Sequence, residues 1–187
     1  MEQDKVYVVV DMLYDFIDGT MACQNAENAV NNTIENLQNK CYSKIIYICD
    51  SHPSNHSSFK SNGGIWPSHC VTGSRGAEIH KAFYNLSKIN YQPSKDNIFR
   101  KGENKDLEQY SGFSAKNNKG EELSSLLKSK NIVISGIASE YCVFETIKDL
   151  LSIDCKIELL ESGLAYVDYN GHLETLNKIK ELGVVVL

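Results

Sequence analysis

Short apolar runs alternate with amphipathic helical patterns along the whole chain. The first run, residues 6–10, is continuously apolar, which is typical of a strand buried on both faces. Later runs of the same kind predict strands at residues 45–49, 97–100, 132–135, 156–160 and 184–187. Apolar residues three or four positions apart predict helices within residues 26–37, 79–86, 123–127, 143–151 and 173–179.

Strands that alternate with helices indicate parallel pairing, because each helix carries the chain back to the start of the next strand. The sequence therefore predicts an α/β protein with a doubly wound, mostly parallel six-stranded sheet and helices on both faces. No composition shift or internal repeat divides the chain. We expect one domain over residues 1–187.

Residues with reactive side chains follow four of the predicted strands. Asp11 follows the first strand, Asp50 and His52 the second, Lys101 the third, and Cys142 lies beyond the fourth. In doubly wound sheets, ligands bind outside the carboxyl ends of the strands. Each residue alone could be a turn residue, a surface charge or a core thiol, but their joint placement predicts a site at this edge.

Cys142 follows a Gly-containing turn and begins a helical pattern. A helix N-terminus favours the thiolate, which is the reactive form of cysteine. A thiol that attacks a carbonyl also needs a base and a positive charge, and Asp11 and Lys101 could supply these. The alternative for Cys142 is a buried structural cysteine.

Histidines cluster close to Asp50. Three of the five histidines, His52, His56 and His69, lie between positions 52 and 69. One carboxylate with two or three imidazoles and open positions for water suits zinc, iron or manganese. The alternative is a set of hydrogen-bonded loop histidines. We expect one divalent metal ion, and we favour zinc.

Four aromatic residues lie near the reactive segments: Phe16, Trp66, Tyr110 and Tyr141. Together they could form the walls of a pocket for a flat ring. Packing roles in the core or in loops would explain Tyr110 and Tyr141 equally well.

The bulk composition narrows the range of partners and compartments. The 187 residues carry a net charge of −5, which argues against nucleic-acid binding and gives no reason to expect membrane attraction. Six cysteines occur without a CxxC pair or a visible signal peptide, so we expect free thiols in a reducing cytoplasm. A homo-oligomer is compatible with the sequence, which does not fix the oligomeric state.

The motifs, in their order along the chain, resemble those of the nicotinamidase branch of the isochorismatase-like cysteine hydrolases. They are residues 8–16 (VVVDMLYDF), 50–59 (DSHPSNHSSF), 66–70 (WPSHC), 101–102 (KG), 110–113 (YSGF) and 136–143 (GIASEYCV). Any one motif is weak, whereas the ordered combination is strong. The resemblance implies the isochorismatase-like hydrolase fold and hydrolysis of nicotinamide to nicotinate and ammonia in NAD salvage. Pyrazinamide would be a further substrate.

The resemblance also implies a role for each matching residue. Asp11, Lys101 and Cys142 match a catalytic triad whose cysteine forms a thioester. The ligands of a metal that binds the substrate match Asp50, His52 and His69, with His56 a ligand in only some members. Phe16 and Trp66 match residues that sandwich the pyridine ring. The Ile137–Ala138 peptide matches a cis bond that aims Ala138 N–H, with Cys142 N–H, into an oxyanion hole.

Departures from the family pattern concern selectivity more than reaction type. Leu13 stands where Gln is common, Ser51 where Trp is common, and Ser139-Glu140 where Thr-Asp is common. Alternative readings are a related hydrolase acting on a carbamoyl, ureido or isochorismate substrate, and a non-catalytic binding protein on the same fold. A metal-dependent oxygenase would leave Cys142 and Lys101 without a role.

Overall fold

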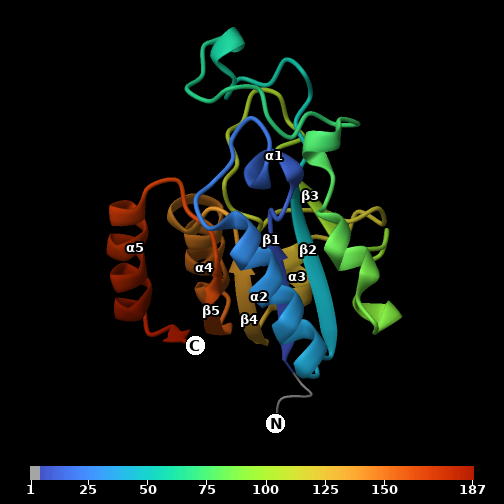
Figure 1. The fold of residues 1–187 in the computed structure, drawn as a ribbon, viewed down its shortest axis with the longest axis vertical. Coiled ribbons are helices and arrows are strands. Elements are labelled where there is room, and N and C mark those ends of the chain that lie inside the picture. The colour runs from blue at the N-terminus through green and yellow to red at the C-terminus, as the bar shows by residue number, and fades with distance from the viewer. Residues whose placement is uncertain (1–4) are drawn as a thin grey trace.

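The computed structural model describes residues 5–187, which form a six-stranded sheet with helices on both faces (Figure 1). Its strands are β1 (Val6–Val10), β2 (Lys44–Asp50), β3 (Ile98–Lys101), β4 (Asn131–Gly136), β5 (Lys156–Leu164) and β6 (Val185–Val186). They lie in the order β3-β2-β1-β4-β5-β6. Every pairing between these strands is parallel, so the predicted doubly wound sheet is confirmed.

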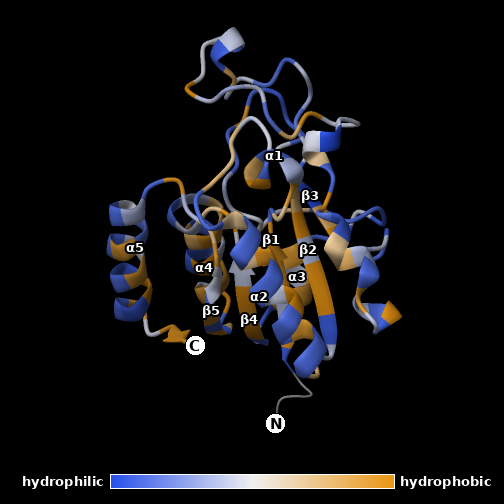
Figure 2. Cartoon of the chain, viewed as in Figure 1, coloured by the Kyte–Doolittle hydropathy of each residue, from blue (hydrophilic) through white to orange (hydrophobic). Residues whose placement is uncertain are grey.

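The apolar run of β1 is continuous because this strand is covered on both faces. Tyr7 and Val9 of β1 belong to one core layer with α1 (Tyr14–Ile17) and α2 (Ala26–Asn39). Val6, Val8 and Val10 belong to the other. That layer packs against α3 (Leu123–Leu127), α4 (Phe144–Leu151) and α5 (Tyr169–Glu181). Figure 2 shows the apolar strands between helices with polar outer faces.

Two helical predictions need correction. Residues 79–86 do not form an α-helix, because Ile79 makes a β-bridge with Leu13 and only Lys81–Asn85 turns, as a short 3₁₀ segment. Leu173 does not belong to the buried face of α5 and is 41% exposed. That face is formed instead by His172, Thr175, Leu176 and Ile179.

The sheet topology brings four strand ends together. The chain builds β1, β2 and β3 outward in one direction and then returns to place β4 on the other side of β1. A ligand crevice forms where the direction of winding reverses in this way. The register places Lys101 opposite Asp50, and Asp11 N–H donates to Ile48 O at 2.9 Å. Among residues 5–187, no helix is long and apolar enough to cross a membrane.

Gly136 closes β4 against β1 and provides a test of this packing. A Cβ there would lie 2.3 Å from Val10 O, and the φ of 153° also disfavours a side chain. Gly136→Ala should lower the free energy of unfolding by on the order of 3 kcal/mol, measured by urea denaturation. Gly183→Ala is the matched control, because φ is positive there too but nothing lies within 4 Å. An equal loss in both variants would contradict close approach at Gly136.

Candidate functional site

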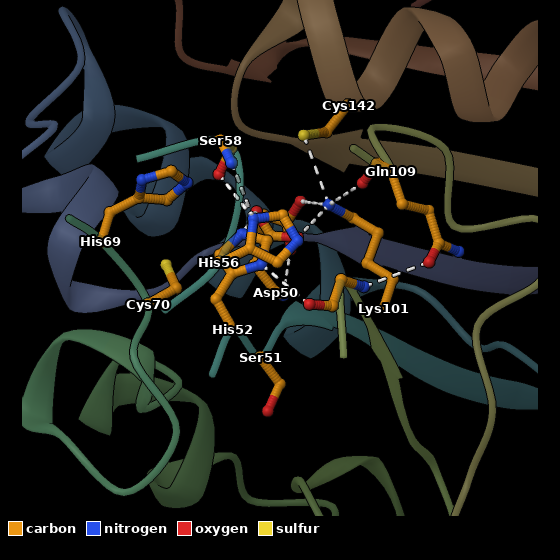
Figure 3. Close-up of polar contacts among 12 residues, drawn as sticks. Asp50, Ser51, His52, His56, Ser58, His69, Cys70, Lys101, Gln109 and Cys142 are labelled. Carbon is orange, nitrogen blue, oxygen red and sulfur yellow. Dashed lines mark hydrogen bonds and ion pairs between the residues drawn. The ribbon is translucent and has the colours of Figure 1, made fainter. Parts of the chain in front are cut away.

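The site is centred on Lys101, whose ammonium group is fully buried at the end of β3. Its Nζ pairs directly with Asp50 (Figure 3). The same Nζ lies 3.0 Å from Asp11 Oδ2. It also donates to Cys142 Sγ at 3.5 Å and to Gln109 O at 3.3 Å. One cation thus contacts residues positioned by β1, β2 and the turn after β4.

The backbone around Asp11 and Cys142 is specialised. Asp11 has a positive φ of 48°, an unusual conformation that is concentrated at functional sites. Its Oδ1 accepts the Asp50 N–H at 2.8 Å, which fixes the carboxylate plane. Cys142 lies in a π-helical turn, Ser139–Val143, that leads directly into α4, and the preceding Ile137–Ala138 peptide is cis as the resemblance implied.

Burial and charge act differently on the four ionisable groups. Burial raises the pKa of Asp11 above its usual value, although Lys101 opposes the change. Burial also opposes ionisation of Asp50, but Lys101 and His52 outweigh it and hold the Asp50 pKa low. For Lys101 the cost of burial is exceeded by its contacts with Asp11 and Asp50, so its pKa rises. Burial raises the pKa of Cys142 despite Lys101, which favours the thiol over the thiolate.

This arrangement can move a proton from sulfur to oxygen. One ligand-type atom from each of Asp11, Asp50 and Cys142 lies within 4.8 Å of the others. The Asp11 carboxylate contacts the Cys142 thiol, and its Oδ2 lies 3.0 Å from Lys101 Nζ. This oxygen is available to accept the thiol proton, and Lys101 is placed to stabilise the thiolate that results.

A second group, Asp50, His52 and His69, fits a divalent metal ion. His52 Nδ1 donates to Gly102 O at 2.9 Å and His69 Nδ1 donates to Pro67 O at 2.8 Å. These bonds leave the lone pair of each Nε2 free, which is how metal-binding histidines are usually oriented. His52 Nε2 is buried without a hydrogen-bond partner in the described chain and lies 3.5 Å from Asp50 Oδ2.

The ligand atoms of these three residues all lie within 4.8 Å of one another. His56 does not join them among the groups found in residues 5–187. Its ring lies 4.2 Å from that of His52, but Nδ1 contacts Ser58 Oγ at 2.7 Å and Nε2 contacts Leu107 O at 3.2 Å.

A pocket lined by aromatic residues opens beside Cys142 and His69. All four aromatic residues singled out in the sequence, Phe16, Trp66, Tyr110 and Tyr141, line it. The Trp66 Nε1–H donates to Tyr110 Oη at 3.0 Å, and both rings pack on Tyr141 with centroids 5.4 and 5.6 Å away. The segments that carry Trp66, Tyr110 and Tyr141 therefore pack together as one wall of the pocket.

Sequence reasoning missed four further lining residues: Met21, Cys23, Glu108 and Val167. They come from irregular segments, where no periodicity indicates which way a side chain faces. Glu108 was the most accessible to prediction, because it lies in the long polar stretch after β3 and two residues before Tyr110. Burial raises the pKa of its carboxyl group, and Asp50 adds to this effect.

Two departures from the family pattern lie outside the pocket. Leu13 is fully buried in the core and bridges to Ile79. Ser51 Oγ lies 3.0 Å from Thr72 Oγ1, in a second hollow at the edge of the sheet. Neither residue lines the pocket beside Cys142, so neither contributes to its walls.

Comparison with known proteins agrees with this geometry. Residues 5–187 match the model of the isochorismatase domain. The chain belongs to the isochorismatase family. This family match covers every residue that the structure describes, including both candidate groups and the pocket.

Relatives within the isochorismatase family match over most of their length. A nicotinamidase of Acinetobacter baylyi is 30% identical, with 89% of this chain and 84% of the relative covered. The structure of PnC1 from L. infantum in complex with nicotinate is 29% identical with a TM-score of 0.85, covering 100% and 93% of the two chains. The pyrazinamidase of Pyrococcus horikoshii in complex with zinc is 30% identical with a TM-score of 0.81, covering 98% of each chain.

Lys101→Met tests whether the buried cation holds the site together. The variant should lose about 3–5 kcal/mol of stability near neutral pH, because two buried carboxylates lose their partner. Without Lys101, burial would raise both carboxyl pKa values above their unfolded values, which favours the folded state only at low pH. The deficit relative to the parent should therefore be larger at pH 8 than at pH 5.

Urea unfolding of the chelated protein at both pH values measures this deficit. Lys148→Met is the control, since Lys148 forms an exposed pair with Glu145 and should change stability little at either pH. A deficit in Lys101→Met that does not grow with pH would show that lost packing, rather than lost charge, is responsible.

Proposed function

We propose that this protein is a nicotinamidase that hydrolyses nicotinamide to nicotinate and ammonia. The observation that carries the proposal is the buried contact of Lys101 with Asp11 and Cys142 beside an aromatic-walled pocket. The names of the Acinetobacter relative and of the two structural neighbours support the same substrate class. Pyrazinamide, which has a similar ring and amide, is a second substrate in this proposal, and the reaction serves NAD salvage.

Asp11, Lys101 and Cys142 carry the chemistry. Asp11 takes the thiol proton, Lys101 stabilises the thiolate, and the sulfur attacks the amide carbon. Asp11 then gives its proton to the departing ammonia as the C–N bond breaks, which leaves a thioester. Water, deprotonated by Asp11, attacks the thioester carbon and releases nicotinate, and the proton returns to Cys142.

The N–H groups of Ala138 and Cys142 hold the oxyanion that forms during both attacks. Ala138 N–H makes no hydrogen bond with any described residue, so it is available for this role. Donors that are already oriented toward the developing charge stabilise it without reorganisation. Cys142 supplies both the second N–H donor and the attacking sulfur, so both donors and the nucleophile lie within residues 138–142.

The proposed metal ligands are Asp50, His52 and His69, and the proposed ion is zinc, with iron and manganese also compatible with these donors. A bound ion would orient the substrate through its ring nitrogen, directly or through water. Phe16 and Trp66 would pack against the two faces of the ring, and Tyr110 and Tyr141 would complete the pocket. The proposal leaves His56 outside the ligand set, because both of its ring nitrogens already have partners.

The proposed setting is the reducing cytoplasm. All six cysteines are free thiols, which suits a nucleophile that must remain reduced. No contact with nucleic acid or membrane is part of the proposal. A homo-oligomer stays a prediction, and light scattering measures the oligomeric state.

Release of ammonia from nicotinamide is the first measurement. The purified protein should release ammonia, lose most of this activity on chelation, and recover it when zinc is added back. The physical reason is that the metal orients the ring while the triad stays intact. No ammonia from the metal-replete protein would overturn the nicotinamidase assignment, and carbamoyl and ureido compounds would then be the substrates to test.

Two substitutions separate the chemistry from metal binding. Cys142→Ala should abolish turnover and leave metal content unchanged, because the thiol is absent from the proposed ligand set. His52→Ala should lower metal content and raise KM. Metal analysis and steady-state kinetics measure both effects, with Cys155→Ala, a buried thiol that donates to Leu127 O, as the control. Substantial activity in Cys142→Ala would rule out a thioester.

A further inference from the structure

Ser139 and Glu140 of the turn that carries Cys142 form a hydrogen-bonded network with His172, and within residues 5–187 this network makes no side-chain hydrogen bond to the triad or the metal group. Ser139 is fully buried and directly follows Ala138. Its Oγ lies 3.0 Å from Glu140 Oε2 and 2.8 Å from Nδ1 of His172 on α5. The network therefore ties the turn that carries the nucleophile to the last helix.

The direction of each hydrogen bond follows from the number of protons. A carboxylate only accepts, so the single hydroxyl proton of Ser139 goes to Glu140. The Ser139 oxygen must then accept from His172, which fixes the proton of the imidazole on Nδ1. Burial lowers the pKa of His172, which favours the neutral ring at pH 7.

Glu140 also holds the loop between β5 and α5. Its Oε1 accepts the N–H groups of Val167 at 3.0 Å and Asp168 at 2.8 Å. Val167 lines the pocket, and Asp168 caps α5 by accepting the Gly171 N–H at 2.8 Å. One carboxylate thus sets the distance between a pocket wall and the turn that carries Cys142.

The same network reaches a second wall. The ring of Tyr166 stacks on His172 with centroids 4.5 Å apart. The Tyr166 backbone exchanges two hydrogen bonds with Gln24, at 2.8 and 3.2 Å. Gln24 adjoins Cys23, which lines the pocket. Glu140 therefore holds the wall at Val167, while the wall at Cys23 is connected to His172 through Gln24 and Tyr166.

We propose that Glu140 is a positioning residue that, with Ser139 and His172, holds Val167 of the pocket wall against the turn carrying Ala138 and Cys142. Glu140 acts through the loop, so it affects how the ring is held rather than the bond-making step. A wall that contacts the ring equally in the ground and transition states contributes to KM with little effect on kcat. The inference rests on the proposed nicotinamidase activity for its kinetic consequence only.

Glu140→Ala and Glu140→Gln test the proposal. Glu140→Ala leaves two loop N–H groups without an acceptor and should raise KM for nicotinamide roughly tenfold, with kcat changed much less. In Glu140→Gln the carbonyl oxygen can still accept from the loop, so KM should stay within about threefold of the parent. Its amide group would donate to Ser139, which would then donate to His172 and move the imidazole proton to Nε2.

Nitrogen-15 NMR of His172 shows which ring nitrogen carries the proton, and this measurement does not depend on enzyme activity. The parent should show Nδ1–H, and Glu140→Gln should show Nε2–H. Glu174→Gln removes an exposed carboxylate from α5, the helix that carries His172, and should change neither the NMR spectrum nor KM. A purely structural role would lower the melting temperature of Glu140→Ala and leave KM at 25 °C unchanged, and that result would overturn the proposal.

Failure of the proposed function is distinguishable from failure of this inference. If the parent protein hydrolyses no nicotinamide, hydrogen exchange of the Val167 and Asp168 amides still tests whether Glu140 holds this loop. Both amides should exchange at least about tenfold faster in Glu140→Ala than in the parent, because Glu140 is their acceptor. Unchanged exchange, or a parent His172 protonated at Nε2, would overturn the network itself.

Discussion

A buried ammonium group, that of Lys101, is the constraint on which the rest of the site depends. Taking such a charge out of water costs several kcal/mol unless opposite charges replace the lost hydration. Asp11 and Asp50 supply that compensation, because β1, β2 and β3 end side by side with Lys101 opposite Asp50. The strand order and register are therefore requirements of this cation as much as of the apolar core.

The same cation gives two neighbouring carboxylates different properties. Asp50 has both Lys101 and His52 as partners, and together they overcome its burial, so it stays anionic and suited to a metal. For Asp11, burial raises the pKa by more than Lys101 lowers it, and the negative charge of Asp50 raises it further. The pKa of Asp11 is thus shifted toward neutral pH, where a group can act well as both general acid and general base.

The strands and the residues at their ends could be predicted from sequence for one physical reason. A parallel strand covered on both faces must be apolar throughout, so its end is visible as the first polar residue, as at Asp11 and Asp50. Lys101 lies one residue beyond the first polar residue of its short strand, and the metal group was inferred instead from the clustering of His52, His56 and His69 near Asp50. Leu173 was assigned to the wrong face because helical spacing alone does not show that Tyr166 stacks on His172 and that α5 turns this side inward.

The remaining pocket walls, at Met21, Cys23, Glu108 and Val167, were not predictable in this way, because they come from irregular segments without periodicity. Asp15 accepts the Thr20 N–H at 3.2 Å and the Cys70 N–H at 2.7 Å, and so joins the segment before Cys23 to the one after His69. Glu140 does the same for the loop of Val167. The strand ends thus determine which reaction the site can perform, while these carboxylates determine the shape of the space in which it occurs. Substitutions in the loops can therefore alter which ring fits while the bond-making groups stay in place.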